Sequence, residues 1–150
     1  MTKIDDSKEL KVSAIQNGTV LDHIPSNQLF RVIDILKLNE SSDAITFGIN
    51  LDSKSMVNKG IIKIANRFFC DNEINMISLI APNASVNIIH DFKVAEKKII
   101  SLPEKVTGIV KCMNPACVTN HQNIETQFTT TRKNNKIGLV CRYCEKITEI

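Results

Sequence analysis

Residues 112–117 read Cys-Met-Asn-Pro-Ala-Cys, and residues 141–144 read Cys-Arg-Tyr-Cys. The chain thus carries two cysteine pairs, spaced C-x4-C and C-x2-C, separated by 23 residues. Two short cysteine-bearing turns can supply the four thiolates that a tetrahedral zinc ion requires, and four thiolates leave the metal no open position for catalysis. The spacing therefore predicts a structural zinc site with four ligands: Cys112, Cys117, Cys141 and Cys144.

Two disulfide bonds, or iron in a rubredoxin-like site, are the alternatives for these cysteines. The first six residues are polar and lack the apolar segment of a secretory signal. We therefore expect a cytoplasmic protein, since a reducing compartment favours metal over disulfides. No apolar run reaches the length of a membrane span, so no membrane partner is expected. Cys70, the fifth cysteine, is expected to be a small buried apolar residue.

The small net charge limits the classes of partner. The formal charge is +3, and a zinc ion held by four thiolates would lower it to about +1. Nucleic-acid-binding domains usually show a clear basic face, so no nucleic-acid partner is expected. The alternative function is a nucleic-acid-binding zinc ribbon that would use Arg132, Lys133 and Lys136. The three histidines are scattered and form no recognisable catalytic motif, so no enzymatic activity is expected.

The first hundred residues are rich in Ile, Val and Leu and predict a conventional apolar core. An Asn-Gly pair at 17–18 favours a hairpin turn there. Apolar spacing of three and four predicts one helix after Pro25-Ser26 and a second from Asp71 or Asn72 to about Ile80. Strands are predicted by apolar alternation at five places: 10–15, 18–24, 44–51, 60–66 and 84–94.

This order of elements predicts an α+β fold with a ferredoxin-like antiparallel sheet and two helices. The stretch Ser101-Leu102-Pro103-Glu104 is predicted to be a linker, because proline excludes continued strand pairing. We therefore expect two domains, 1–100 with the sheet and helices and 101–150 as a small all-β zinc-binding domain. The second is too short to fold on its own core, so the metal would supply much of its folding energy.

Six stretches spread over nearly the whole chain have a specific order and spacing. They are 18–25 (GTVLDHIP), 61–64 (IIKI), 81–87 (APNASVN), 101–104 (SLPE), 112–117 (CMNPAC) and 141–146 (CRYCEK). Together they resemble the regulatory chain of aspartate carbamoyltransferase. The resemblance implies a non-catalytic chain whose residues 1–100 bind nucleoside triphosphates, with CTP as inhibitor and ATP as activator. It also implies that residues 101–150 dock on the catalytic chains of this enzyme of pyrimidine biosynthesis, and that regulatory chains form a homodimer.

The resemblance further implies a nucleotide site in the first domain. Lys63 and Lys97 would bind the phosphates, Asp22 would lie near the ribose and His23 near the phosphates. Lys63 stands between two isoleucines, so its side chain is expected on the opposite face of the strand. Taken singly, these residues are also explained as ordinary strand, loop and turn positions, and Lys98 could replace Lys97. The base would be lined by Val12, Ala14 and Ile15 on one side and by Asn87, Ile89, Phe92 and Val94 on the other.

Overall fold

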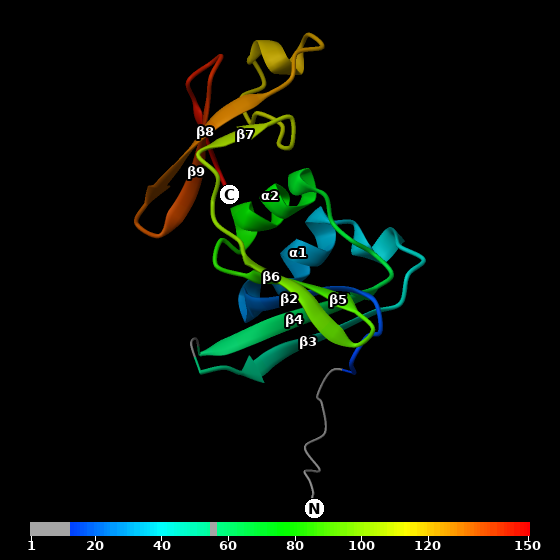
Figure 1. The fold of residues 1–150 in the computed structure, drawn as a ribbon. Helices are drawn as coiled ribbons and strands as arrows, with labels where there is room; N and C mark the ends of the chain where they lie inside the picture. Colours follow the sequence, from blue (N-terminus) through cyan, green and yellow to red (C-terminus); the bar gives the residue numbers. More distant parts are fainter. Residues whose placement is uncertain (1–12, 55–56) are drawn as a thin grey trace, which may run out of the picture.

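The computed structural model describes residues 13–54 and 57–150. Its first part is a five-stranded antiparallel sheet in the order β3-β4-β2-β5-β6, with helices α1 and α2 covering one face (Figure 1). The expected α+β class and ferredoxin-like alternation of strands and helices are confirmed. The bounds are β2 (Gly18–Pro25), α1 (Leu29–Ile35), β3 (Ile45–Asp52), β4 (Asn58–Ala65), α2 (Asp71–Ile80), β5 (Ser85–His90) and β6 (Lys93–Ile99).

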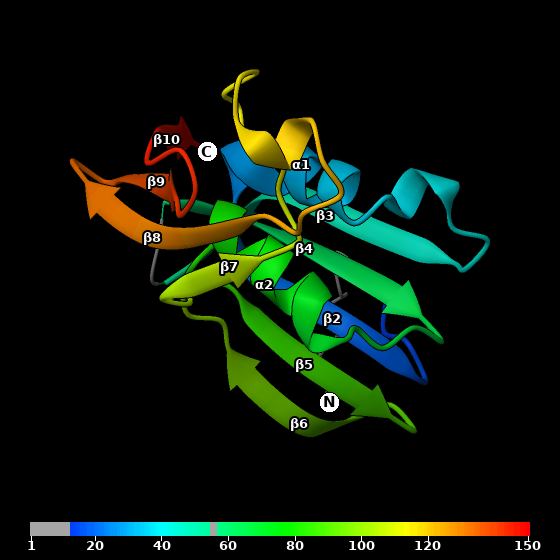
Figure 2. The same cartoon turned by 90° about the horizontal axis from the view of Figure 1, so that it is seen from above.

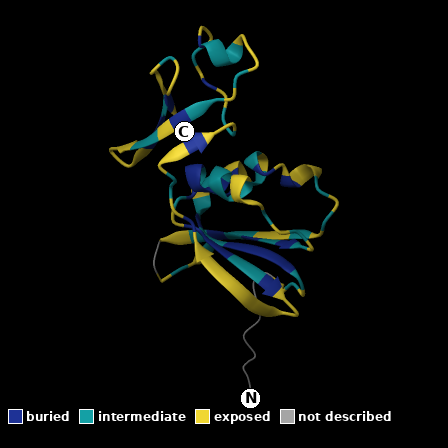
Figure 3. Ribbon diagram, turned by 45° about the horizontal axis from the view of Figure 1, so that its top comes forward, coloured by how far each residue is buried: buried dark blue, intermediate teal, exposed yellow. Residues whose placement is uncertain are grey.

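The alternation of side chains along the central strands decides which sheet face is buried. Leu21 on β2 pairs with Ile62 on β4 and Val86 on β5, and all three are at most 1% exposed. Their side chains share one face because residues directly opposite in neighbouring strands point the same way. This face packs against the helices, where Leu29 and Val32 of α1 are fully buried. Figure 3 shows the buried strip beneath the helices and the exposed edge strand β6.

The start of α2 corrects the expectation for Cys70. The helix begins at Asp71, and Cys70 is its N-cap residue in a capping box with Glu73. The backbone N–H of Cys70 donates to Glu73 Oε1 at 3.2 Å. Capping places Cys70 at the surface, where it is exposed instead of buried.

The expected hairpin around Asn17-Gly18 is wrong. Strand β2 pairs with β4 along one edge and with β5 along the other, so neither edge is left for the residues before Gly18. Residues 13–15 lie outside any strand, and residues 10–12 of the expected strand lie outside the described residues. Asn17 instead accepts hydrogen bonds from two neighbouring turns. Its carbonyl accepts from Asn66 N–H at 2.9 Å, and its Oδ1 accepts from Asp91 N–H at 3.1 Å.

The single strand expected over 84–94 is in fact two strands. β5 and β6 form a hairpin whose two turn residues, Asp91 and Phe92, have φ angles of 50° and 65°. Two residues with positive φ are typical of the tight turns that suit the twist of a hairpin. Apolar residues recur at the even positions Val86, Ile88, Phe92 and Val94 on both sides of the turn, so the apolar pattern gave no sign of the break.

The second part of the chain is a four-stranded antiparallel sheet in the order β10-β9-β8-β7. Its strands are β7 (Lys105–Thr107), β8 (Gln127–Lys133), β9 (Lys136–Cys141) and β10 (Ile147–Glu149). It lies on the helix side of the larger sheet, so the helices stand between the two sheets (Figures 1 and 2). No helix in the described ranges is long and apolar enough to cross a membrane.

A contact with the linker and a shared core position the second sheet beside the first part. Thr130 on β8 donates from its Oγ1 to the carbonyl of Pro103 at 2.6 Å, which holds the linker against the sheet. Leu79 of α2 is buried in one cluster with Val106, Phe128 and Leu139 of the second part. One residue of the first part thus belongs to the core of the second.

Candidate functional site

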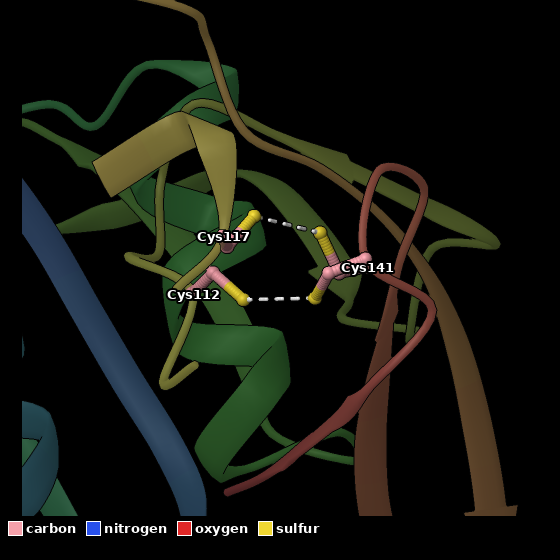
Figure 4. Close-up of side chains that lie close together, drawn as sticks. Cys112, Cys117 and Cys141 are labelled. Carbon is pink, nitrogen blue, oxygen red and sulfur yellow. Dashed lines mark hydrogen bonds between the residues drawn. The ribbon is translucent and has the colours of Figure 1, made fainter. Parts of the chain in front are cut away.

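The four C-terminal cysteines converge from two loops. Cys112 and Cys117 lie in the segment between β7 and the 3₁₀ turn Val118–Asn120, whereas Cys141 ends β9 and Cys144 follows in the next turn. Figure 4 shows Cys112, Cys117 and Cys141 directed toward one another. All four sulfur atoms lie within 4.8 Å of each other. The structure therefore brings together the complete set of predicted metal ligands.

The spacing of the sulfur atoms fits a tetrahedral metal site. The Cys112 and Cys144 sulfurs are 3.6 Å apart, and those of Cys117 and Cys141 are 3.8 Å apart. A tetrahedral thiolate site with metal–sulfur bonds of about 2.3 Å has sulfur–sulfur edges of about 3.8 Å. The free thiols are thus already at the separation that a bound ion would impose.

The surrounding loops position the ligands and set their protonation. The Asn120 side-chain amide donates to the carbonyls of Cys112 at 3.0 Å and Asn114 at 2.7 Å, which closes the first loop. Burial raises the pKa of the Cys112 thiol to about 12. Hydrogen bonds from the Asn114 side chain and the Lys146 backbone lower the pKa of Cys144 to about 6. A metal would therefore displace a proton from Cys112 while finding Cys144 already ionised at neutral pH.

A second constellation lies on the sheet face opposite the helices. Lys63 on β4 pairs with Val20 on β2, Val20 pairs with Asn87 on β5, and Asn87 pairs with Lys97 on β6. These four side chains form one row across four strands, on the open face of the sheet. Lys98 pairs with buried Val86 and so belongs to the other face. The register thus brings Lys63, Asn87 and Lys97 together and separates Lys98 from them.

Asp22 lies two residues after Val20 on β2, beside this row, and His23 follows it. The Asp22 carboxylate is 2.9 Å from the Lys59 ammonium, and it accepts from the His23 backbone N–H at 2.6 Å. His23 has a φ of 59°, where the pairing of β2 with β4 is irregular, and its Nδ1 is 3.4 Å from Ser85 Oγ. Burial lowers the pKa of Lys63, and the charge of Asp22 raises it. Opposite charges therefore meet beside the row on the open face.

Reasoning from the sequence missed Lys59. It lies four residues before Lys63 on β4, so both side chains have the same parity and point to the same face. The alternation of 59–64 was the signal that could have identified it. Its pairing with Asp22 could not be foreseen, because that contact depends on the register of β2 against β4.

The remaining predicted nucleotide-site residues lie around the β5–β6 hairpin and the start of β2. Ile89 pairs with Val94 two positions along β5 from Asn87, and Phe92 is exposed in the hairpin turn. Ala14 is exposed and Ile15 half-buried in the segment that precedes β2. Val12 lies outside the described residues. The predicted polar groups thus lie in the row, and the predicted apolar groups lie around the β5–β6 hairpin and before β2.

Comparisons with known proteins identify both parts of the chain. Residues 10–101 match the family model for the aspartate carbamoyltransferase regulatory chain, allosteric domain, and residues 104–150 match the model for its metal binding domain. The chain is 50% identical over 142 residues to the aspartate carbamoyltransferase regulatory chain of Bacteroides thetaiotaomicron, covering 95% of this chain and 92% of that one. It is 44% identical over 143 residues to the regulatory chain of Pyrococcus abyssi, covering 94% and 93%. The chain belongs to the family of aspartate carbamoyltransferase regulatory chains.

Proposed function

We propose that residues 1–100 of this regulatory chain bind nucleoside triphosphates on the open face of the larger sheet, with CTP as inhibitor and ATP as activator. The observation that carries this proposal is the row that joins Lys63, Asn87 and Lys97. Two ammonium groups on one face suit the several negative charges of a triphosphate. The allosteric domain matched by residues 10–101 supports a regulatory ligand in this part of the chain.

Each part of the proposed site has a distinct task. Lys63 and Lys97 bind phosphate oxygens, and His23 lies near the phosphates. Asp22 accepts hydrogen bonds from the ribose hydroxyls, in exchange for part of its contact with Lys59. Asn87 and backbone groups of the strands distinguish the bases through donors and acceptors at the ring edge. The apolar walls of the base pocket are formed by Val12, Ala14, Ile15, Ile89, Phe92 and Val94.

We assign the metal of the four-cysteine site as one structural Zn²⁺ ion per chain. Support comes from the four buried or half-buried sulfur donors and from their spacing, which matches a tetrahedral zinc site. A closed shell of four thiolates gives the ion no role at a substrate. Free thiols are maintained in reducing conditions, so the proposal places the protein in the cytoplasm.

The zinc-binding domain, residues 101–150, docks on the catalytic chains in this proposal. Support comes from exposed apolar side chains beside the cysteine loops: Met113 is 63% exposed, Tyr143 41% and Ile147 53%. Exposed apolar and aromatic residues of this kind are typical anchors of protein interfaces. Through this contact the chain would regulate the enzyme of pyrimidine biosynthesis that its relatives are named for.

We also propose that the first domain pairs with its copy, giving a regulatory homodimer. Strand β3 is an edge of the sheet, and Phe47 on it packs edge-to-face with Phe30 of α1, with ring centroids 5.8 Å apart. Both rings are exposed, and an unpaired edge beside apolar surface favours cover by another chain.

Nucleotide titration of three matched variants tests the nucleotide site. Lys63→Gln and Lys97→Gln each remove a charge-assisted contact, so calorimetry should show about tenfold weaker binding of CTP and ATP. Lys98→Gln is the control, because it makes the same charge change on the neighbouring residue of the opposite face, and it should change the affinity less than about twofold. Equal weakening by Lys97→Gln and Lys98→Gln would mean that only the overall charge matters and would refute the site.

Sedimentation tests the docking role. The metal-loaded chain is mixed with the catalytic chains of the same enzyme, and the complex is analysed before and after chelation. We expect a larger complex that dissociates when the metal is removed, because docking depends on a domain that the metal folds. A complex that persists with metal-free chain, verified by metal analysis, would contradict the proposal.

A further inference from the structure

A basic cleft lies between the two parts of the chain. Its volume is about 370 Å³, and it is bounded by α1 and α2 on one side and by the β8–β9 hairpin on the other. Arg31 of α1, Arg132 of β8 and Lys136 of β9 line it, and Leu79 and Ile137 are among its apolar lining residues. No aspartate or glutamate side chain lines the cleft in the part of the chain that the structure describes.

Among the described residues, the cationic side chains of this cleft have no aspartate or glutamate partner. Arg31 donates to Gln28 Oε1 at 2.9 Å, a neutral acceptor. Within residues 13–54 and 57–150, Arg132 and Lys136 make no ion pair. Elsewhere the pattern differs, since the Arg67 guanidinium lies 2.8 Å from Glu73. Three cations that line one cleft without an acidic side chain create a positive potential that attracts an anion.

The side chains indicate the class of anion. The planar guanidinium groups of Arg31 and Arg132 offer paired donors that match the oxygens of phosphate, and Lys136 adds a point charge. The apolar lining leaves room for an uncharged portion of the ligand. We propose that this cleft is a binding site for a small phosphorylated anion.

The proposed site connects the two domains. Arg31 belongs to the first domain, whereas Arg132 and Lys136 belong to the second. An anion that contacts all three holds α1 and the β8–β9 hairpin in one relative position. The site is separate from the nucleotide site proposed above, because the cleft lies on the helix side of the sheet and Lys63 and Lys97 lie on the open face.

Inorganic pyrophosphate is the probe, and the metal-loaded full chain is the protein. The Lys63→Gln/Lys97→Gln chain serves as background, so that binding on the open face is reduced. In this background calorimetry should detect saturable pyrophosphate binding, and adding Arg132→Gln should weaken it about tenfold. Adding Lys133→Gln is the matched control: this neighbour on β8 does not line the cleft, and its loss should change the affinity less than about twofold. Metal content is measured in every sample, because pyrophosphate binds metals.

Three results would overturn the proposal. One is the absence of saturable binding in the background chain. Another is equal weakening by Arg132→Gln and Lys133→Gln. The third is succinate binding as tightly as pyrophosphate with the same dependence on Arg132, which would assign the cleft to dicarboxylates. None of these results bears on CTP or ATP binding by the wild-type chain.

Discussion

The two domains of this chain are held together by different means. Among the described residues, the core of the first contains thirteen buried side chains, all aliphatic, from the sheet, both helices and the loops beside them. The core of the second contains seven buried residues, of which three are cysteines and one, Leu79, comes from the other domain. We expect burial of apolar area to suffice for the first domain, whereas the second should depend on its metal and on its neighbour. In the proposed function, a self-sufficient ligand-binding domain would thus be joined to a docking domain that folds only with its metal.

Removing the metal should produce the largest difference between the two domains. Chelation, or Cys117→Ser, removes metal binding that contributes on the order of 10 kcal/mol to folding of such sites. We expect amide resonances of residues 104–150 to lose their dispersion while those of the first domain keep theirs. Cys70→Ser is the control, because Cys70 is exposed and outside the cluster, and it should retain the metal. Simultaneous unfolding of both domains would show that the first is not self-sufficient.

Leu21→Ala tests the first core. Leu21 is fully buried between Ile62 and Val86, so its truncation should lower the free energy of unfolding of the first domain by about 2–5 kcal/mol. Urea denaturation followed by circular dichroism measures the change. The exposed Ile99→Ala should cost less than about 0.5 kcal/mol. A similar loss in both variants would mean that burial does not decide stability here.

Leu79→Ala tests whether the second domain depends on a residue of the first. The substitution removes an apolar contact from the second core although the residue belongs to α2, and we expect a loss of about 2 kcal/mol. The loss should appear as weaker metal binding and as earlier unfolding of residues 104–150. Asn72→Ala, on an exposed position of the same helix, should leave metal affinity unchanged. Unchanged metal affinity in Leu79→Ala would show that the second core does not need its neighbour.

The pH dependence of metal affinity should be the smallest effect. Metal affinity falls with falling pH wherever a ligand thiol must lose its proton. The pKa of Cys144 is lowered to about 6, so this thiol is ionised above that pH and competes with protons only below it. In a plot of the logarithm of metal affinity against pH, from chelator competition, the slope should therefore increase by about 1 below pH 6, because one more proton is released on metal binding. Asn114→Ala removes the hydrogen bond that lowers this pKa and should move the break upward; a break that stays in place would contradict its assignment to Cys144.

Sequence was sufficient for features that depend on local spacing. The two cysteine pairs predicted the sulfur cluster because a metal site needs only two turns that present paired thiolates. The alternation around Lys63 correctly placed it on the face opposite Ile62 and Ile64, since side-chain direction follows strand period alone. The predicted order of strands and helices was enough to assign the fold class, because that order is characteristic of ferredoxin-like folds.

Features that depend on pairing between distant segments could not be predicted from sequence. Which lysine, Lys97 or Lys98, lies beside Lys63 depends on the register of β6 against β5, which the apolar pattern left open. The hairpin turn at Asp91 was hidden because Phe92 and Val94 continue the alternation of the preceding strand. The Asn17-Gly18 signal failed because both edges of β2 are taken by strands far along the chain. At Asn17-Gly18, tertiary pairing overrides the local turn preference.

The burial of Leu79 has a consequence for newly made chains. During synthesis α2 leaves the ribosome before residues 104–150, so Leu79 stays open to solvent until the last cysteine has been translated and the metal has been acquired. A cell short of metal would therefore accumulate chains with a folded first domain, an apolar surface on α2 and an unfolded tail. Such chains are substrates for chaperones and proteases, and we expect pulse-chase labelling to show faster turnover of the chain under metal starvation. Metal supply would then set how many regulatory chains survive to join the enzyme.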